Sequence, residues 1–460
     1  MEKIKKLFQA TDMTTGDPWK RIVVFAIPML IGNIAQQLYS TVDSIVVGKY
    51  VGDNALAAVG SSAPILNLLL VMFIGISMGA SIMVSQHFGA KQREELSHTI
   101  GNCITLTAIS VIIVMVLAVL LVRPLLVLLK TPDSIIDWCT SYLMILLGGY
   151  IGSAYYNILS GILRGLGDAF SALIYLLVAT VLNIVLDLLF VAKFDMGVSG
   201  VAWATVIAQA VSAVLCFIRL KKMTDVLDIH PRYMKLSGEY SGNIIKLGLP
   251  SGLTQAIFSM AMIVVQSLTN SFGEQFIAAN VIIMRVDGFA MLPNFSFGTA
   301  MTTYAGQNVG ARKLDRVVKG AKQGTLIAVL TSATLTGLIL IFGRGLMGIF
   351  TETAELVDLS RSMMNIIAAG YIAMAVTQSL SGVMRGAGDT MTPMWISIVT
   401  TVLIRVPVAY GISWLTRTPE LPNGRSECIF ISLLCSWVLG AVITTFFYLR
   451  GNWKKKTMIG

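Results

Sequence analysis

The sequence predicts an all-α integral membrane protein, with about twelve transmembrane helices in two six-helix lobes related by a parallel internal repeat. Three observations lead to this fold class. The chain is strongly apolar, its apolar residues form blocks long enough to cross a bilayer, and two motifs recur at one fixed spacing. Together they exclude an ordinary water-soluble domain.

The composition is that of a chain that needs a lipid environment. Of its 460 residues, 55% are hydrophobic and 13% are charged, and the mean hydropathy is +0.77. Soluble domains carry about 25% charged residues. The apolar residues run in long blocks, such as 104–122, 174–191 and 326–342, each close to the ~20 residues that span a bilayer core. We therefore interpret these blocks as membrane spans.

The apolar blocks and the polar connections between them predict the individual helices. We expect spans near residues 20–42, 55–80, 98–122, 137–158, 170–192, 198–219, 244–268, 276–303, 321–343, 361–382, 392–415 and 428–449.

Basic residues predict how the spans are oriented, because short loops rich in Lys and Arg stay in the cytoplasm. The connections after even-numbered spans are the basic ones, and both termini are therefore expected on the cytoplasmic side of the cell membrane. The formal net charge of +10 then flanks the inner leaflet of the bilayer and requires no nucleic acid as a partner. The basic residues of these connections are Lys91, Arg93, Arg164, Arg219, Lys221, Lys222, Lys235, Arg312, Lys313, Arg316, Lys319 and Arg385.

Two motifs recur at the same offset of 221 residues. The segment SGILRGLGD at 160–168 returns as SGVMRGAGD at 381–389, and QHFGAK at 86–91 returns as QNVGAR at 307–312. Each copy holds about six spans, an even number, so both copies have the same orientation and are related by an axis along the membrane normal. We expect an N-terminal lobe at 1–220, a cytoplasmic linker at 221–241 and a C-terminal lobe at 242–460.

A two-lobed helical protein with parallel repeats is typical of secondary transporters, whose central cavity needs polar lining. Polar residues recur at spacings of three and four along the first span and again along the seventh, and Pro28 and Pro250 predict a kink near the start of each. The side chains predicted to line the substrate cavity are Gln36, Gln37, Ser40, Gln255, Gln266, Arg285 and Asp287.

Acidic residues inside spans are expensive and are functional candidates by default. Asp43 lies in the first span, and Asn183 and Asp187 lie four residues apart on one face of the fifth. Two carboxylates brought together in a medium of low dielectric cannot both stay ionised cheaply, so the pair should bind a proton or a sodium ion. Sodium at these three residues is the only metal that we expect. The repeat offset places apolar Val264, Ile404 and Val408 at the corresponding positions, so only the first lobe has this group.

These residues together resemble the multidrug and toxic compound extrusion (MATE) transporters over nearly the whole chain. The resemblance is carried by Ala26-Ile27-Pro28, the segment VDSIVVG at 42–48, the segment 52–58, the two duplicated motifs and the segment 183–187. It implies twelve helices, a V-shaped cavity and drug export in exchange for protons or sodium ions. The carboxylates of the first lobe favour cationic or neutral amphipathic substrates, and the two lobes predict alternating access. It also implies a first-lobe network of Asp43, Asn157, Asn183, Asp187 and Thr205. Gln255 departs from family branches that have an acidic residue in the seventh span, which favours coupling through the first lobe.

Other interpretations of the same residues remain open. Asp43 is also suited to capping a helix end. The polar stripe of the first span is also suited to holding helices together. The residues Arg285, Asp287 and Arg405 are equally suited to structural pairing. A lipid-linked oligosaccharide flippase of the same superfamily is the main alternative function, although its anionic substrate would favour more arginines. An intramembrane aspartyl protease, suggested by Gly-x-Gly-Asp at 165–168, is disfavoured because the motif is duplicated beside a loop arginine, where it suits a turn and a helix cap. We therefore expect a monomeric transporter that is not an enzyme and has no cofactor.

Overall fold

The structure is a computed structural model that describes residues 10–128 and 131–457, and every regular element in those residues is helical. The predicted all-α class is confirmed. Among the described residues, nine helices are long and apolar enough to cross a membrane, and two bent helix pairs raise this number to as many as eleven. Helix α3 (Asp53–Gly89) occupies the predicted second span but is not among the helices in this count. The predicted number of twelve spans therefore remains a prediction.

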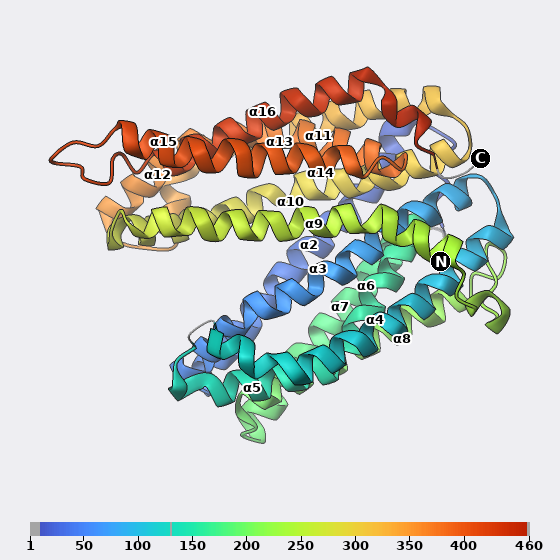
Figure 1. Cartoon of the computed structure of the whole chain (residues 1–460), viewed down its shortest axis with the longest axis horizontal. Helices are drawn as coiled ribbons and strands as arrows, with labels where there is room; N and C mark the ends of the chain where they lie inside the picture. The colour runs from blue at the N-terminus through green and yellow to red at the C-terminus, as the bar shows by residue number, and fades with distance from the viewer. Residues whose placement is uncertain (1–9, 129–130, 458–460) are drawn as a thin grey trace. The chain divides into compact units, whose positions relative to one another are not determined.

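The chain divides into two compact units. Unit 1 contains residues 31–252 and the described residues before Met13, drawn mostly in blue and green in Figure 1. Its helices are α2 (Pro18–Tyr50) from Ile31 onward, α3, α4 (Arg93–Leu128), α5 (Asp133–Gly148), α6 (Tyr150–Gly165), α7 (Ala169–Asp187), the π-helical η1 (Leu188–Lys193), α8 (Gly197–Lys221), the short 3₁₀ helix η2 (Pro231–Met234) and the first part of α9 (Gly238–Asn270).

Unit 2 contains residues 13–30 and the described residues from Leu253 onward. Its helices α10 (Glu274–Gly310), α13 (Gly370–Gly386) and α16 (Cys428–Arg450) pack successively against one another. In Figure 1 these helices are coloured from yellow to red. Besides the remaining parts of α2 and α9, the unit holds α10 (Glu274–Gly310), α11 (Leu314–Gly348), α12 (Ala354–Ala368), α13 (Gly370–Gly386), α14 (Met391–Ile398), the π-helical η3 (Val399–Arg405), α15 (Val406–Leu415), α16 (Cys428–Arg450) and the 3₁₀ helix η4 (Asn452–Lys455).

Both duplicated motifs adopt the same local structure in their two copies. Lys91 and Arg312 each follow the end of a long helix with φ of 57°, the left-handed conformation that closes a helix C-terminus. Asp168 accepts a hydrogen bond from the Ser171 amide at 3.0 Å and so caps α7. Asp389 likewise accepts from the Thr392 amide at 3.3 Å. The turn and helix cap predicted for the Gly-x-Gly-Asp motif are therefore confirmed.

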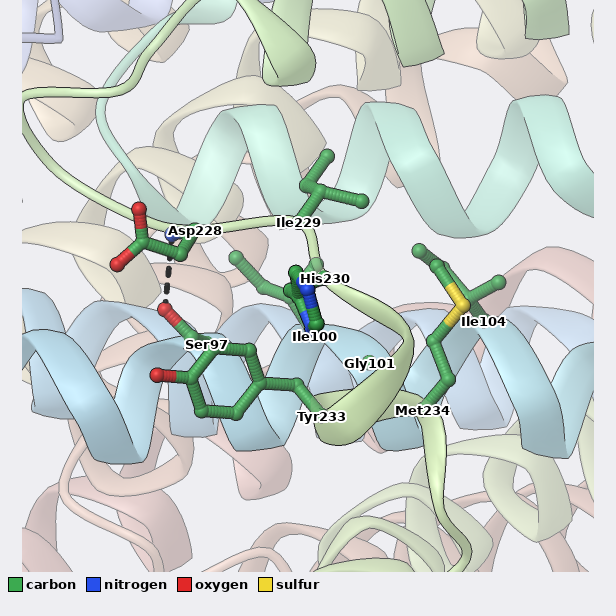
Figure 2. Close-up of a pocket in the computed structure, with 9 residues that line it drawn as sticks. All are labelled: Ser97, Ile100, Gly101, Ile104, Asp228, Ile229, His230, Tyr233 and Met234. Carbon is green, nitrogen blue, oxygen red and sulfur yellow. Dashed lines mark hydrogen bonds between the residues drawn. The ribbon is translucent and has the colours of Figure 1, made fainter.

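Residues 222–237, which we call the strap, connect α8 to α9 and pack along the first turns of α4. Figure 2 shows the contact: the Asp228 amide donates to Ser97 Oγ at 2.9 Å. Gly101 allows the close approach, because a Cβ atom there would lie 2.2 Å from the carbonyl oxygen of Tyr233, which is itself buried. The segment predicted as a linker is thus firmly attached to unit 1.

Candidate ion-coupling site

Two helices of unit 1 bring the predicted acidic residues together. Asp43 comes from α2, and Asn183 and Asp187 come from the last turns of α7, one helical turn apart. With the Asn183 amide oriented so that its nitrogen faces the carboxylates, it donates to Asp43 Oδ1 at 2.9 Å and to Asp187 Oδ2 at 3.3 Å. One amide therefore links both carboxylates.

The two carboxylates differ in depth and in the use of their oxygens. Asn183 and Asp187 are fully buried, whereas Asp43 is half-buried. Within residues 10–128 and 131–457, Asp187 Oδ1 has no hydrogen-bond partner. Among the residues that the structure describes, neither carboxylate forms an ion pair with Lys, Arg or His. The group thus has strong acceptors and no fixed positive charge, which suits a bound proton or a small cation.

Two tyrosines complete the surroundings of the carboxylates. Tyr39 and Tyr142 are buried, and both interact electrostatically with Asp43 and Asp187. The Tyr39 hydroxyl donates to Thr205 Oγ1 at 3.2 Å, which connects predicted Thr205 to the group. Neither tyrosine is among the residues predicted from the sequence. Tyr39 was detectable, because it lies one helical turn before Asp43, whereas Tyr142 comes from α5 and nothing in its local sequence indicates the contact.

Asn157 lies on α6 and forms hydrogen bonds within α6 and to α3. Its side-chain amide nitrogen donates to the backbone carbonyl of Ser153 at 2.8 Å. Its backbone carbonyl accepts from the Ser77 hydroxyl at 2.7 Å. Among the described hydrogen bonds, none joins Asn157 to Asp43 or Asp187. The structure therefore places Asn157 at the packing of α6 against α3.

The polar stripe of α2 includes an exposed row. Gln36 and Ser40 are exposed and Gln37 is half-buried. The Ser40 hydroxyl donates to the Gln36 carbonyl at 3.3 Å, and the Thr41 hydroxyl donates to the Gln37 carbonyl at 2.9 Å. The hydroxyls are thus satisfied within the helix, and the glutamine side chains are the polar groups that this face offers.

In unit 2 the predicted residues are more widely distributed. Gln255 is exposed on α9, and the Gln266 amide donates to Asn270 Oδ1 at 2.8 Å. Arg285 is exposed on α10, whereas Asp287 is half-buried. Their different environments agree with their spacing of two residues, which puts them on different helix faces.

Pro28 and Pro250 both lie inside long helices, as predicted. The boundary between the two units follows each proline by two residues, after Leu30 in α2 and after Gly252 in α9. Proline frees the carbonyl one turn earlier and weakens the helix at that point. Each of these helices therefore has its weakest turn near the position where it passes from one unit into the other.

No group of three or more His, Cys, Asp or Glu suited to holding a metal occurs among the described residues. Two carboxylates and an amide are what the site of unit 1 provides. This donor set consists of oxygen ligands if the Asn183 amide turns its oxygen inward, and hard cations prefer such ligands.

Comparison with known proteins places these observations in a family. The MatE family model matches residues 28–189 and again residues 250–411. The Probable multidrug resistance protein YoeA of Bacillus subtilis is 29% identical over an alignment of 447 residues, and the alignment covers 95% of this chain and 95% of that protein. The Probable multidrug resistance protein YpnP of the same organism is 28% identical and covers 97% of this chain and 98% of its own. A structure described as the outward-facing conformation of a multidrug resistance MATE family transporter matches 97% of this chain and 99% of its own at 25% identity, with a TM-score of 0.89.

Proposed function

This multi-pass membrane chain belongs to the MatE family, and we propose that it exports small amphipathic, cationic compounds in exchange for protons or sodium ions. The observation that carries the proposal is the group of Asp43, Asn183 and Asp187, in which one amide links two carboxylates that have no basic partner among the described residues. The multidrug resistance relatives support the substrate class.

The coupling follows from the electrostatics of the site. Two ionised carboxylates in a buried environment repel each other, and removing them from water is costly. A proton or a sodium ion removes this cost, and so does a cationic substrate that approaches the half-buried Asp43 from the polar face of α2. The substrate therefore binds the ionised carboxylates, and the ion binds the same carboxylates in its place. This competition for one group is the condition for exchange.

The proposed transport cycle uses both units. Ion binding at the carboxylates of unit 1 changes the bend of α2 at Pro28 and releases the substrate outward. The ion then leaves to the cytoplasm and a new substrate enters, by alternating access of the two units. The proposal includes twelve helices in two parallel six-helix lobes, at 1–220 and 242–460, a position in the cell membrane with both termini cytoplasmic, and a monomer as the working unit.

The flippase remains the alternative function. An anionic lipid-linked sugar needs a basic cavity, whereas the candidate site of unit 1 contains two carboxylates and no basic partner among the described residues. We therefore place it second.

Competition between ion and substrate tests the proposal directly. The affinity of the purified protein for ethidium, a fluorescent cation, should fall as the proton or sodium concentration rises. In Asp43→Asn this ion dependence should disappear while the thermal midpoint stays near that of the wild type. An ethidium affinity that depends on neither ion in folded wild-type protein would exclude exchange through this site and make the flippase the working hypothesis.

A further inference from the structure

Unit 2 contains a buried arginine whose hydrogen-bonding capacity is largely unused. Arg405 is the last residue of η3 and is only 7% exposed. The acceptor of its Nη1 group is the thioether sulfur of Met262 at 3.5 Å, and its Nε group has no acceptor in the part of the chain that the structure describes. A thioether is a weak acceptor, so a guanidinium that offers five donors is held in the protein interior without a strong partner.

The nearest opposite charge does not fill this role. Asp287 on α10 interacts electrostatically with Arg405, but among the described residues the two do not form an ion pair within 4.0 Å. Asp287 instead accepts a hydrogen bond from the Tyr371 hydroxyl at 3.0 Å, and Tyr371 is buried on α13. The carboxylate offsets part of the positive charge, while among the described residues the guanidinium donates only to the weak acceptor Met262 Sδ and its Nε has no partner.

This arrangement is specific to unit 2. The repeat offset places Ile184 of α7 at the position that corresponds to Arg405. The corresponding position in unit 1 is therefore apolar, whereas unit 2 has a buried arginine there. Arg405 also ends a π-helical segment, a local irregularity that frequently occurs at functional sites.

We propose that Arg405 binds the carboxylate of zwitterionic substrates and so determines which amphipathic compounds this transporter exports. A guanidinium binds a carboxylate through two parallel hydrogen bonds, and its burial makes this recognition stronger than at an exposed surface. The inference rests on the proposed export function. It adds that purely cationic compounds do not need Arg405, whereas compounds with both charges do.

Rhodamine B and its ethyl ester provide a matched pair of probes, because they share a fluorophore and differ in whether the carboxylate is free. Transport of both dyes is measured in proteoliposomes with wild type, Arg405→Met and Arg405→Lys. We expect Arg405→Met to reduce the rate of rhodamine B transport at least about tenfold, because losing one charge-assisted hydrogen bond weakens binding by about that factor. Transport of the ester should be kept. Arg405→Lys should fall between, since lysine keeps the charge and loses the paired geometry.

Two outcomes would overturn the inference. An equal loss of both dyes in Arg405→Met would make the residue structural, and unchanged transport of both would leave it without a role in recognition. Arg417→Met removes an exposed arginine in the loop after α15 and is the control. If the wild type transports neither dye nor ethidium, the export function itself fails. Fluorescence titration of the purified variants with rhodamine B and its ester then still tests carboxylate binding at Arg405.

Discussion

At the level of single residues, the two carboxylates of unit 1 differ in their access to the surroundings. Asp43 is half-buried on α2, whereas Asp187 is fully buried and one of its oxygens has no hydrogen-bond partner among the residues described. Because the Asn183 amide contacts both, a proton or ion on one carboxylate changes the hydrogen bonding of the other. Asn183 is thus the residue that makes the pair respond as one group.

This role of Asn183 gives the first prediction. Asn183→Ala leaves both carboxylates in place and removes the donor between them. Since a hydrogen bond to a charged group contributes about 1.5–3 kcal/mol, the ion dependence of ethidium binding should shift by roughly ten- to a hundredfold in concentration. Thr180→Ala is the control, because this hydroxyl, one turn earlier on α7, donates to the Leu176 carbonyl of the same helix. Equal behaviour of the two variants would mean that the amide does not couple the carboxylates.

The sequence predicted part of this site. Burying a carboxylate in a membrane span is so costly that Asp43 and Asp187 stand out by position alone, and the spacing of four brings Asn183 to the same face of α7. The meeting of α2 with α7 is a tertiary contact that no local pattern contains. Tyr142 was missed for the same reason, and the environment of Asn157 is set by its neighbours on α3 and α6.

At the level of elements, helix positions follow hydropathy, whereas irregular turns do not. The predicted spans near 170–192 and 392–415 are occupied by helices, yet each contains a π-helical segment, η1 or η3, that apolar periodicity does not reveal. Two other predicted spans are bent pairs, α5 with α6 at 51° and α12 with α13 at 43°. Hydropathy reports how long a span is, while these breaks depend on packing.

The strap gives the second prediction, also at this scale. Gly101→Ala places a methyl group 2.2 Å from the Tyr233 carbonyl, so the strap must move away from α4. We expect the protein to lose about 1–3 kcal/mol of stability, as in other overpacked sites, and its thermal midpoint in detergent to fall.

The matched control for the strap is Gly242→Ala on α9. A Cβ atom at Gly242 meets nothing within 4 Å, and alanine favours a helix over glycine by about 0.5–1 kcal/mol, so this variant should be neutral or more stable. Similar midpoints for Gly101→Ala and Gly242→Ala would show that the strap does not need its close contact with α4.

At the level of the whole molecule, the 221-residue offset is the observation from which most of the architecture was predicted. The same family model matches the chain twice, and both copies of the Gly-x-Gly-Asp motif form a turn and a helix cap. The compact units nevertheless exchange segments: residues 13–30 belong to unit 2, and residues 238–252 to unit 1. A repeat in the sequence shows where copies begin and end, but it does not show which surface each first helix packs against.

The central claim is that export of a cation is driven by an ion that binds at the carboxylates of unit 1. The most direct test places the purified protein in liposomes, imposes a proton or a sodium gradient separately, and follows ethidium movement in wild type and Asp43→Asn. We predict that one of the two gradients drives ethidium movement in the wild type, and that Asp43→Asn abolishes it without unfolding the protein. If neither the proton gradient nor the sodium gradient drives ethidium movement in wild-type protein shown to be folded, the claim is contradicted.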